Sequence, residues 1–559
     1  MRRLTLPVLG LVLGVVVLGL RRLGDFDLPW HLALGRELFR HTLTGDTLSY
    51  TFPGRASPVE WLADGGLWLC FRAGGALGLQ VLAATVAALL AVVVMATTRA
   101  PMMFRLAAAS SALLIAAPWL VVRPALLGLL AATVVVYLIE RHRTTHSLWP
   151  IMLAGLVQLA AAQVHGFCVL GAMVLVGWAI YAGLCRLTKG RFPSLLPAKD
   201  ARGWVIAYAL GGAALTVIGP FGLAVFTAPF RVRGFDHSIT EWAPTSLKLV
   251  VTLVPAFGIG ALVAVVVIWV GLRDRKLPLY ELGLVAGSLA LAFGGIRLIP
   301  VFGLLGIPVV VRRLAPAMDK ARSAPLLCSV LALALAPSVA LIPGIQLGRG
   351  FDDANLPTHA TNWLAAHGVA GRPFHFLPFG GEVALRLHDE GTRVFIDGRT
   401  AWLYPRPFFD AYERAEHDLA AFDALDAEYQ FDWALVRARP SEHFSEPLAG
   451  HRQFRMVYLD DCAAIYVRTN GAMASLIPAA YQAIHHLTPA AALLAAPPPP
   501  SLLDHDAQLA LTQAPTSPRA HFLDAAAARA THDQNRLVQA RAWLQLHAPD
   551  DSYSVLVGN

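Results

Sequence analysis

Two carboxylates stand two residues apart directly after the first apolar stretch of the chain, at Asp25 and Asp27. At the boundary between membrane and water such a pair can bind a divalent cation, Mg²⁺ or Mn²⁺, or take a proton from an acceptor hydroxyl. Asp27 precedes Leu28-Pro29, a typical helix start, so it also has an ordinary alternative role as an N-cap. We therefore predict Asp25 as general base or metal ligand, and Asp27 as cap or second ligand.

The segment around this pair is unusually basic. It carries six arginines, Arg21, Arg22, Arg36, Arg40, Arg55 and Arg72. On the outer face of a membrane, guanidinium groups would suit a lipid-linked phosphate, although contact with lipid headgroups or pairing with local acids explains them equally well. We take Arg36, together with His31 and Glu60, as candidate substrate-binding residues.

A second polar segment, 227–246, contains a further acidic residue and further basic residues. Glu241 is a candidate second catalytic acid with Arg231 nearby, and a solvated loop charge is the alternative for Glu241. His165, Arg123 and Arg297 stand at the ends of apolar runs, where ionisable groups are functional hypotheses by default. Arg123 could equally end a helix and reach the membrane surface. We assign these basic residues to substrate binding.

The elements that must position these residues are membrane helices. The chain has 559 residues, of which 56% are hydrophobic and 15% charged, with a mean hydropathy of +0.55. Soluble domains carry about 25% charged residues, so a soluble globule is excluded. Apolar runs long enough to cross a bilayer recur up to residue 346. We predict about eleven spans, at 4–20, 75–97, 106–121, 125–139, 149–164, 167–184, 204–226, 247–271, 279–296, 298–311 and 325–346.

Charge divides the chain into two parts. Residues 1–346 carry 29 Lys+Arg and 13 Asp+Glu, a net of +16, whereas residues 347–559 carry 16 and 24, a net of −8. The basicity therefore belongs to membrane loops, and we expect no nucleic-acid partner. The five cysteines lie far apart, so no Cys-x-x-Cys metal motif exists. Phosphate-loop, zinc-protease and nucleophile-elbow motifs are also missing from the sequence.

Basic residues also predict the orientation in the membrane. With the N-terminus in the cytoplasm, the cytoplasmic loops hold 16 Lys and Arg, against five on the other side after the first loop. Positive loops stay inside, and eleven crossings then place the acidic C-terminal part outside. The first external loop, 21–74, is the local exception. We predict a bacterial inner membrane protein whose C-terminal part is periplasmic or extracellular.

The external part divides again. Residues 351–470 have the pattern of a small α/β domain, with strands at 373–377, 393–397, 432–438, 455–459 and 463–468 and helices near 357–367, 406–428 and 441–449. Residues 471–559 predict a helical tail with one weakly tetratricopeptide-like pair, which is too little for a repeat array. This tail could dock a protein partner or cap the α/β domain.

Several short stretches together resemble a known family. They are Asp25–Gly35, Asp46–Tyr50, Glu60–Leu62, Arg123-Pro124, His165-Gly166, Gly219–Gly222, Ile239–Pro244, Arg297–Pro300 and Phe395–Arg399. An acidic pair after the first membrane helix, followed by a helix at the membrane surface, resembles the GT-C superfamily of membrane glycosyltransferases. The whole chain resembles uncharacterised bacterial multi-span proteins of that architecture. The Trp-Trp-Asp signature of oligosaccharyltransferases is missing from the sequence.

The resemblance implies an enzyme of the cell envelope that uses a polyprenyl-phosphate-linked sugar. The first-loop acid would activate the acceptor or hold a divalent cation, basic residues would hold the donor phosphate, and the acceptor would be a glycan, a lipid or a protein. The alternative is a non-enzymatic scaffold or transport partner in envelope polysaccharide assembly. A solute transporter is disfavoured, because the sequence has no matched inverted halves.

Overall fold

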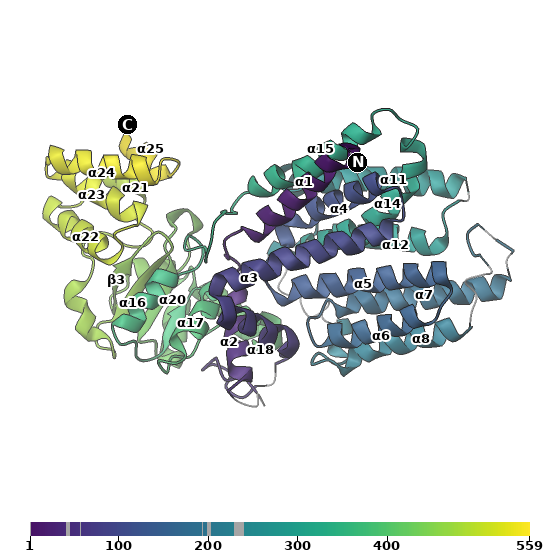
Figure 1. The fold of residues 1–559 in the computed structure, drawn as a ribbon. Coiled ribbons are helices and arrows are strands. Elements are labelled where there is room, and N and C mark those ends of the chain that lie inside the picture. The colour runs from purple at the N-terminus through teal and green to yellow at the C-terminus, as the bar shows by residue number, and fades with distance from the viewer. Residues whose placement is uncertain are drawn as a thin grey trace. The chain divides into compact units, whose positions relative to one another are not determined.

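The computed structural model describes residues 2–40, 45–55, 57–189, 191–192, 194–197, 203–227, 240–274 and 276–558 (Figure 1). The chain forms two compact units. The membrane unit comprises Met1–Leu23, Leu34–Phe39 and Pro58–Phe351, and the external unit comprises Gly24–Ala33, Arg40–Ser57 and Asp352–Asn559. Two short segments of the first loop therefore belong to the external unit, although the chain passes to that unit for good only after Phe351.

The membrane unit is a bundle of apolar helices (Figure 1). Among the described residues, six segments are long and apolar enough to span a membrane: Trp61–Thr98, Met102–Trp119, Pro124–Thr145, Cys168–Thr188, Pro255–Arg273 and Ile296–Met318. Five shorter apolar helices are Leu4–Gly19, Trp149–Ala162, Gly203–Ile218, Leu279–Gly294 and Ala324–Ala340. Every expected apolar run therefore coincides with a helix, and the count of eleven crossings stays a prediction.

Figure 1 labels most of the helices of this unit. They are α1 (Arg2–Gly19), α3 (Trp61–Thr98), α4 (Met102–Ala116), α5 (Pro124–Thr145), α6 (Trp149–Ala162), α7 (Cys168–Thr188), α8 (Gly203–Ala214), α10 (Leu247–Thr252), α11 (Pro255–Arg273), α12 (Leu279–Gly294), α13 (Ile299–Val301), α14 (Ile307–Met318) and α15 (Ala324–Ala340). Helix α2 (Leu28–Leu38) follows the acidic pair, where the sequence predicts a helix.

Two helix boundaries differ from the expectation. Helix α3 begins at Trp61 rather than at residue 75, and it is interrupted at Gly75, whose φ of 56° is left-handed. The polar residues Asp64 and Arg72 lower the local hydropathy and hide this first part of the helix. The expected span 247–271 is divided into α10 and α11, because Pro255 starts a new helix at its first turn.

Small residues let the helices of the bundle approach closely. Helix α1 packs along α15, α5 along α6, and α7 along α8. A side chain at Gly10 of α1 would lie 2.6 Å from the backbone of Ala332 in α15, so this crossing requires glycine. Lipid offers no hydrophobic driving force between helices, and close backbone packing is then the main source of association.

The external unit contains a four-stranded mixed sheet of order β1-β2-β4-β3. Its strands are β1 (Pro373–His375), β2 (Trp433–Arg437), β3 (Phe454–Leu459) and β4 (Ala463–Arg468). Strand β1 pairs with β2 in parallel, and the other pairs are antiparallel. Its helices are α16 (Thr358–Ala366), α17 (Gly380–Leu387), α18 (Thr400–Leu403), α19 (Arg406–Ala415) and α20 (Leu419–Tyr429), and the tail adds α21 (Ala490–Ala495), α22 (Pro500–Gln513), α23 (Pro518–Ala530), α24 (Gln534–His547) and α25 (Ser552–Gly558).

Three expectations for the α/β domain were wrong in detail. Segment 393–397 is not a strand of the sheet: Val394 bridges Ser49, and the Phe395 N–H donates to His375 Nε2 at 3.1 Å, which takes a bond that a strand would need. The expected helix 406–428 is two helices, because Asp418 caps a new start. The expected helix 441–449 is two short 3-10 turns, at Pro440–Glu442 and Glu446–Gly450.

Buried His375 makes the external unit sensitive to acid. Burial lowers the pKa of this imidazole to about 4, against about 6.5 in an unfolded chain. The unfolded chain therefore binds the proton first, so the stability contribution is complete above about pH 6.5 and is lost as the pH falls towards 4, by up to about 3 kcal/mol. We expect faster hydrogen exchange of β1 and β2 amides at pH 4.5 than at pH 7 after correction for intrinsic rates. The His375→Gln variant should lose this difference, and an unchanged pH response in that variant would contradict the assignment.

Candidate functional site

The first-loop acids are held by local hydrogen bonds in the external unit. Asp25 Oδ1 accepts from the Asp27 N–H at 2.9 Å, and Asp27 Oδ1 accepts from the Trp30 indole at 3.1 Å. Both acids are partly exposed. The bond to Trp30 orients Asp27, so Asp27 has a positioning partner as well as its place before α2. The role of each acid in chemistry stays a prediction.

A second motif predicted from the sequence lies against this acidic pair. A side chain at Gly398 would come within 2.4 Å of Asp27 Oδ1 and 2.6 Å of Trp30 Nε1, so the chain can pass here only as glycine. Next to it, Arg399 is buried between two buried acids, with Nη2 2.6 Å from Asp397 Oδ2 and Nη1 2.5 Å from Asp46 Oδ1. This three-residue network joins the first loop to the loop around Gly398. Because Gly398 packs against Asp27, the network also helps to hold the acidic pair in place.

Two other predicted residues lie on α2. The ring of His31 packs on that of Trp30, with centroids 3.5 Å apart, and His31 is buried. Arg36 is also buried and pairs with Glu37 at 3.5 Å. Because Arg36 is already paired inside the fold, it is a weaker candidate for substrate binding than the sequence indicated. Arg231 lies outside the described residues.

The membrane unit brings the other predicted residues together. Arg123 precedes α5, Glu241 lies in the short turn Thr240–Trp242, and Arg297 lies in the turn Ile296–Leu298 after α12. Arg123 Nη2 is 3.2 Å from both carboxylate oxygens of Glu241, and Arg297 Nη1 is 3.8 Å from Glu241 Oε2. These helix ends meet at one end of the bundle, so residues up to 174 positions apart in the chain share one charged cluster.

His165 extends this cluster to the start of α3. Its Nδ1 accepts from the Phe167 N–H at 2.9 Å, which leaves the proton of the neutral ring on Nε2. That nitrogen lies 3.7 Å from Glu60 Oε1 and 3.4 Å from Arg297 Nη2. His165 is thus positioned between an acid and a cation, with its Nε2 facing both.

Sequence reasoning missed two members of the cluster, Asp64 and Phe167. Asp64 is fully buried one helical turn after Glu60, and a carboxylate oxygen of each lies within 4.8 Å of the other. The spacing of four residues on one helix face is the signal that could have found it. The rings of Phe167 and Trp242 lie 5.4 and 5.0 Å from the Arg297 guanidinium, and these contacts hold it in place.

The electrostatics of this cluster keep Glu241 ionised. Loss of water around the carboxyl would raise its pKa, but the guanidinium groups of Arg123 and Arg297 act in the opposite direction and prevail, so the pKa lies below its ordinary value. At neutral pH Glu241 is therefore a carboxylate that orients two arginines. It does not suit the role of a general acid, although a general base or an orienting group is compatible with this state.

An apolar groove runs along the helices that follow Phe167 and Arg297 in the chain. It has a volume of about 260 Å³ and is lined by α7, α12 and the segment after Arg297, from Leu170 and Val301 at one end to Leu184 and Tyr280 at the other. Along α7 this length is about 21 Å, most of the thickness of a bilayer core. Gly177, Gly283 and Gly287 line it, and a side chain at any of them would enter open space. The groove has the shape and polarity for a long hydrocarbon chain.

The acidic pair fits a divalent cation by its donor set. Carboxylate oxygens are the ligands that Mg²⁺ and Mn²⁺ prefer, and Asp25 and Asp27 each present a carboxylate at a partly exposed position. Glu60 and Asp64 form a second carboxylate pair, inside the membrane unit. Either pair would attract a cation, and the cation would supply positive charge next to a substrate phosphate or leaving group.

Comparison with known proteins bears on the fold of this chain. No protein-family model matches the chain, and no curated protein matches it. Among solved structures it is similar to archaeal oligosaccharyltransferase AglB from Archaeoglobus fulgidus, which was solved in complex with an inhibitory peptide and a dolichol-phosphate. The identity is 11%, the TM-score is 0.53, and the match covers 99% of this chain and 86% of that one. The GT-C resemblance is therefore confirmed at the level of the fold.

Proposed function

We propose that the protein transfers a sugar from a polyprenyl-phosphate-linked donor to an acceptor on the outer side of a bacterial inner membrane. The observation that carries this proposal is the apolar groove whose lining reaches Val301, four residues after Arg297, in a fold of the GT-C type. A hydrocarbon tail in the groove would leave its phosphate among Arg123, Arg297 and His165. The AglB structure contains a dolichol-phosphate, which supports a lipid-linked donor here.

The acceptor side is assigned to the acidic pair. Asp25 would take the proton from the acceptor hydroxyl or hold a divalent cation, and Asp27 would assist as second ligand. Arg399 and Trp30 would hold the loop that carries both acids. Sugar transfer needs a deprotonated nucleophile and stabilisation of the departing phosphate, and these two residue groups supply the two requirements separately. The sugar and the acceptor are not specified by these residues.

Turnover of a labelled donor tests the proposal. Purified full-length protein in lipid nanodiscs, incubated with radiolabelled polyprenyl-phosphate sugars and an envelope extract as acceptor, should release labelled product. The scaffold alternative predicts no turnover together with co-purification of partner proteins. Absence of transfer across a panel of sugars, from protein that retains its fold, would reject the enzymatic proposal.

Replacing Arg297 by glutamine should mainly weaken donor binding. The loss of one charge-assisted contact to phosphate costs about 1.5–3 kcal/mol, so we expect KM for the donor to rise about 10- to 100-fold with a smaller change in kcat. Arg297→Lys should recover part of the loss because it keeps the charge. The matched control is Arg393→Gln, an exposed arginine of the external unit. Equal KM values for Arg297→Gln and the control would contradict this role.

A further inference from the structure

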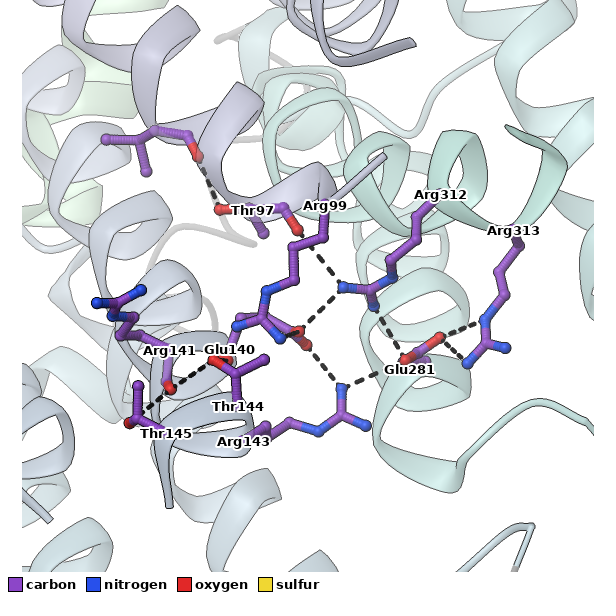
Figure 2. Close-up of polar contacts among 11 residues, drawn as sticks. Thr97, Arg99, Glu140, Arg141, Arg143, Thr144, Thr145, Glu281, Arg312 and Arg313 are labelled. Atoms are coloured by element: carbon purple, nitrogen blue, oxygen red, sulfur yellow. Dashed lines mark hydrogen bonds and ion pairs between the residues drawn. The ribbon is translucent and has the colours of Figure 1, made fainter. Parts of the chain in front are cut away.

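A second charged cluster lies at the opposite end of the membrane unit, and the proposed reaction does not use it. Helix α5 begins beside Arg123 and ends, at the other side of the bundle, with Glu140 and Arg143. There Arg99 at the end of α3 and Arg312 of α14 approach the same glutamate (Figure 2). The loop charges predict this end to be cytoplasmic.

Two glutamates form the centre of this cluster. Glu140 is 2.9 Å from both Arg143 Nη1 and Arg312 Nη1, and 3.5 Å from Arg99 Nη1. Glu281 in the first turn of α12 is 3.0 Å from Arg312 Nη2 and 3.3 Å from Arg143 Nη1, and it also pairs with Arg313 at 2.5 Å (Figure 2). Both glutamates are almost completely buried. The network therefore joins α3, α5, α12 and α14.

The arginines outnumber the glutamates. Arg99, Arg143, Arg312 and Arg313 give four positive charges against two negative ones, a surplus of +2 among these six residues. All six line one cavity of about 340 Å³, together with Thr144 and Pro316. That volume lies within the range of small-molecule sites, about 300–1,000 Å³. Attraction of cations to helix C-termini accounts for Arg99 and Arg143, but Arg312 and Arg313 lie inside α14, and it does not account for a shared cavity with unbalanced charge.

The surplus of positive charge has a visible effect on Arg99. Its burial lowers the pKa of the guanidinium, and although Glu140 acts in the opposite direction, the nearby Arg312 and Arg143 lower the pKa further. Arg99 is also the most accessible of the three arginines around Glu140, with 27% of its side chain exposed against 13% and 14% for the others. An anion in the cavity would relieve this repulsion and would be reached most easily from the side of Arg99.

We propose that this cavity binds a phosphate group carrying one or two negative charges. Arginine forks match phosphate oxygens in geometry and charge, and four guanidinium groups surround the space. The phosphate can belong to the headgroup of an acidic phospholipid, since the cavity lies where membrane helices end, or it can be free in solution. Bound phosphate would tie the ends of four helices together. This proposal is independent of the proposed sugar transfer.

The test compares Arg99→Gln with a matched control. Glu140 keeps Arg143 and Arg312 when Arg99 is replaced, so the variant should fold. Arg273→Gln removes an equally charged arginine from the end of α11, at a position outside the cavity. One arm measures phosphatidylglycerol and phosphatidylcholine binding to full-length protein by native mass spectrometry. The other arm measures thermal stabilisation by inorganic phosphate.

We expect Arg99→Gln to weaken binding about tenfold, the value of one charge-assisted contact, while Arg273→Gln matches the wild type. Arg99→Lys should lose less. A lipid source is indicated when phosphatidylglycerol binds better than phosphatidylcholine and millimolar phosphate does not displace it. Binding of phosphate from solution is indicated when inorganic phosphate stabilises the wild type but not Arg99→Gln. Equal binding by Arg99→Gln and Arg273→Gln in both arms, or no binding by the wild type in either, would overturn the proposal.

Discussion

The Asp25→Asn variant is expected to lose sugar transfer while keeping its abundance in the membrane. If the carboxylate acts as general base, kcat should fall about 10²- to 10⁴-fold. Asparagine keeps the shape and the oxygen that accepts from the Asp27 N–H, so the loop should stay in place. A large loss of kcat with unchanged fold would therefore report the missing charge. The measurement is initial rate with a labelled donor in nanodiscs, normalised to the amount of folded protein.

Two further variants make this result specific. Asp418→Asn is the matched control: Asp418 caps α20 through the Ala421 N–H, and asparagine caps a helix equally well, so activity should not change. Asp27→Asn separates the two acids, because a cap or second ligand should matter less than Asp25. If both acids hold a metal, a manganese titration of Asp27→Asn should show a higher requirement for the cation. Full activity of Asp25→Asn would refute its assignment.

The Arg399→Gln variant should strongly destabilise the external unit. Its side chain is 4% exposed, and the carboxylates of Asp46 and Asp397 that face it are fully buried. Removing one partner from a buried ion network leaves uncompensated charge and costs about 3–5 kcal/mol. Hydrogen exchange in β1 and α17 of the full-length protein should accelerate about 10²- to 10⁴-fold, since each factor of ten corresponds to about 1.4 kcal/mol.

An exposed ion pair in the same unit provides the control. Arg40 Nη1 is 2.6 Å from Asp389 Oδ1, but the two side chains are 44% and 47% exposed. Such pairs contribute about 0–1 kcal/mol, so Arg40→Gln should leave exchange almost unchanged. Arg399→Lys should be intermediate, because a single ammonium cannot serve both acids as the guanidinium fork does. Similar exchange in Arg399→Gln and Arg40→Gln would show that the buried network does not hold this unit together.

The Asp25 and Arg399 variants separate chemistry from structural support. Asp25 tests chemistry at the acidic pair, and Arg399 tests the support behind it, through Gly398 and its contact with Asp27. A support residue should change stability and activity together, whereas a catalytic residue should change activity alone. The pair of results therefore separates the function of the site from the stability of the loops that carry it.

Membrane character, the positions of the apolar helices and the acidic external part were predictable from the sequence, because hydropathy and charge are local properties of the chain. Glu241, Arg123, His165 and Arg297 were also predictable as candidates, since ionisable residues beside apolar runs stand out. The start of α3 was not predictable, because Asp64 is polar and yet buried inside a helix. The strand predicted at 393–397 was wrong because a tertiary contact decides its structure: the Phe395 N–H bonds to the side chain of His375 and not to a neighbouring strand.

Composition and the spacing of residues by themselves determined that this is a membrane protein with charged groups at its helix ends. Only the tertiary structure decided which of those groups meet. Arg123 and Glu241 are 118 positions apart, and Asp46 and Arg399 are 353 apart. Such pairs depend on how helices and loops pack in three dimensions, whereas periodicity along the chain shows only which residues can share one face of a single helix. The apolar groove arises in the same way, from three segments that no local pattern connects.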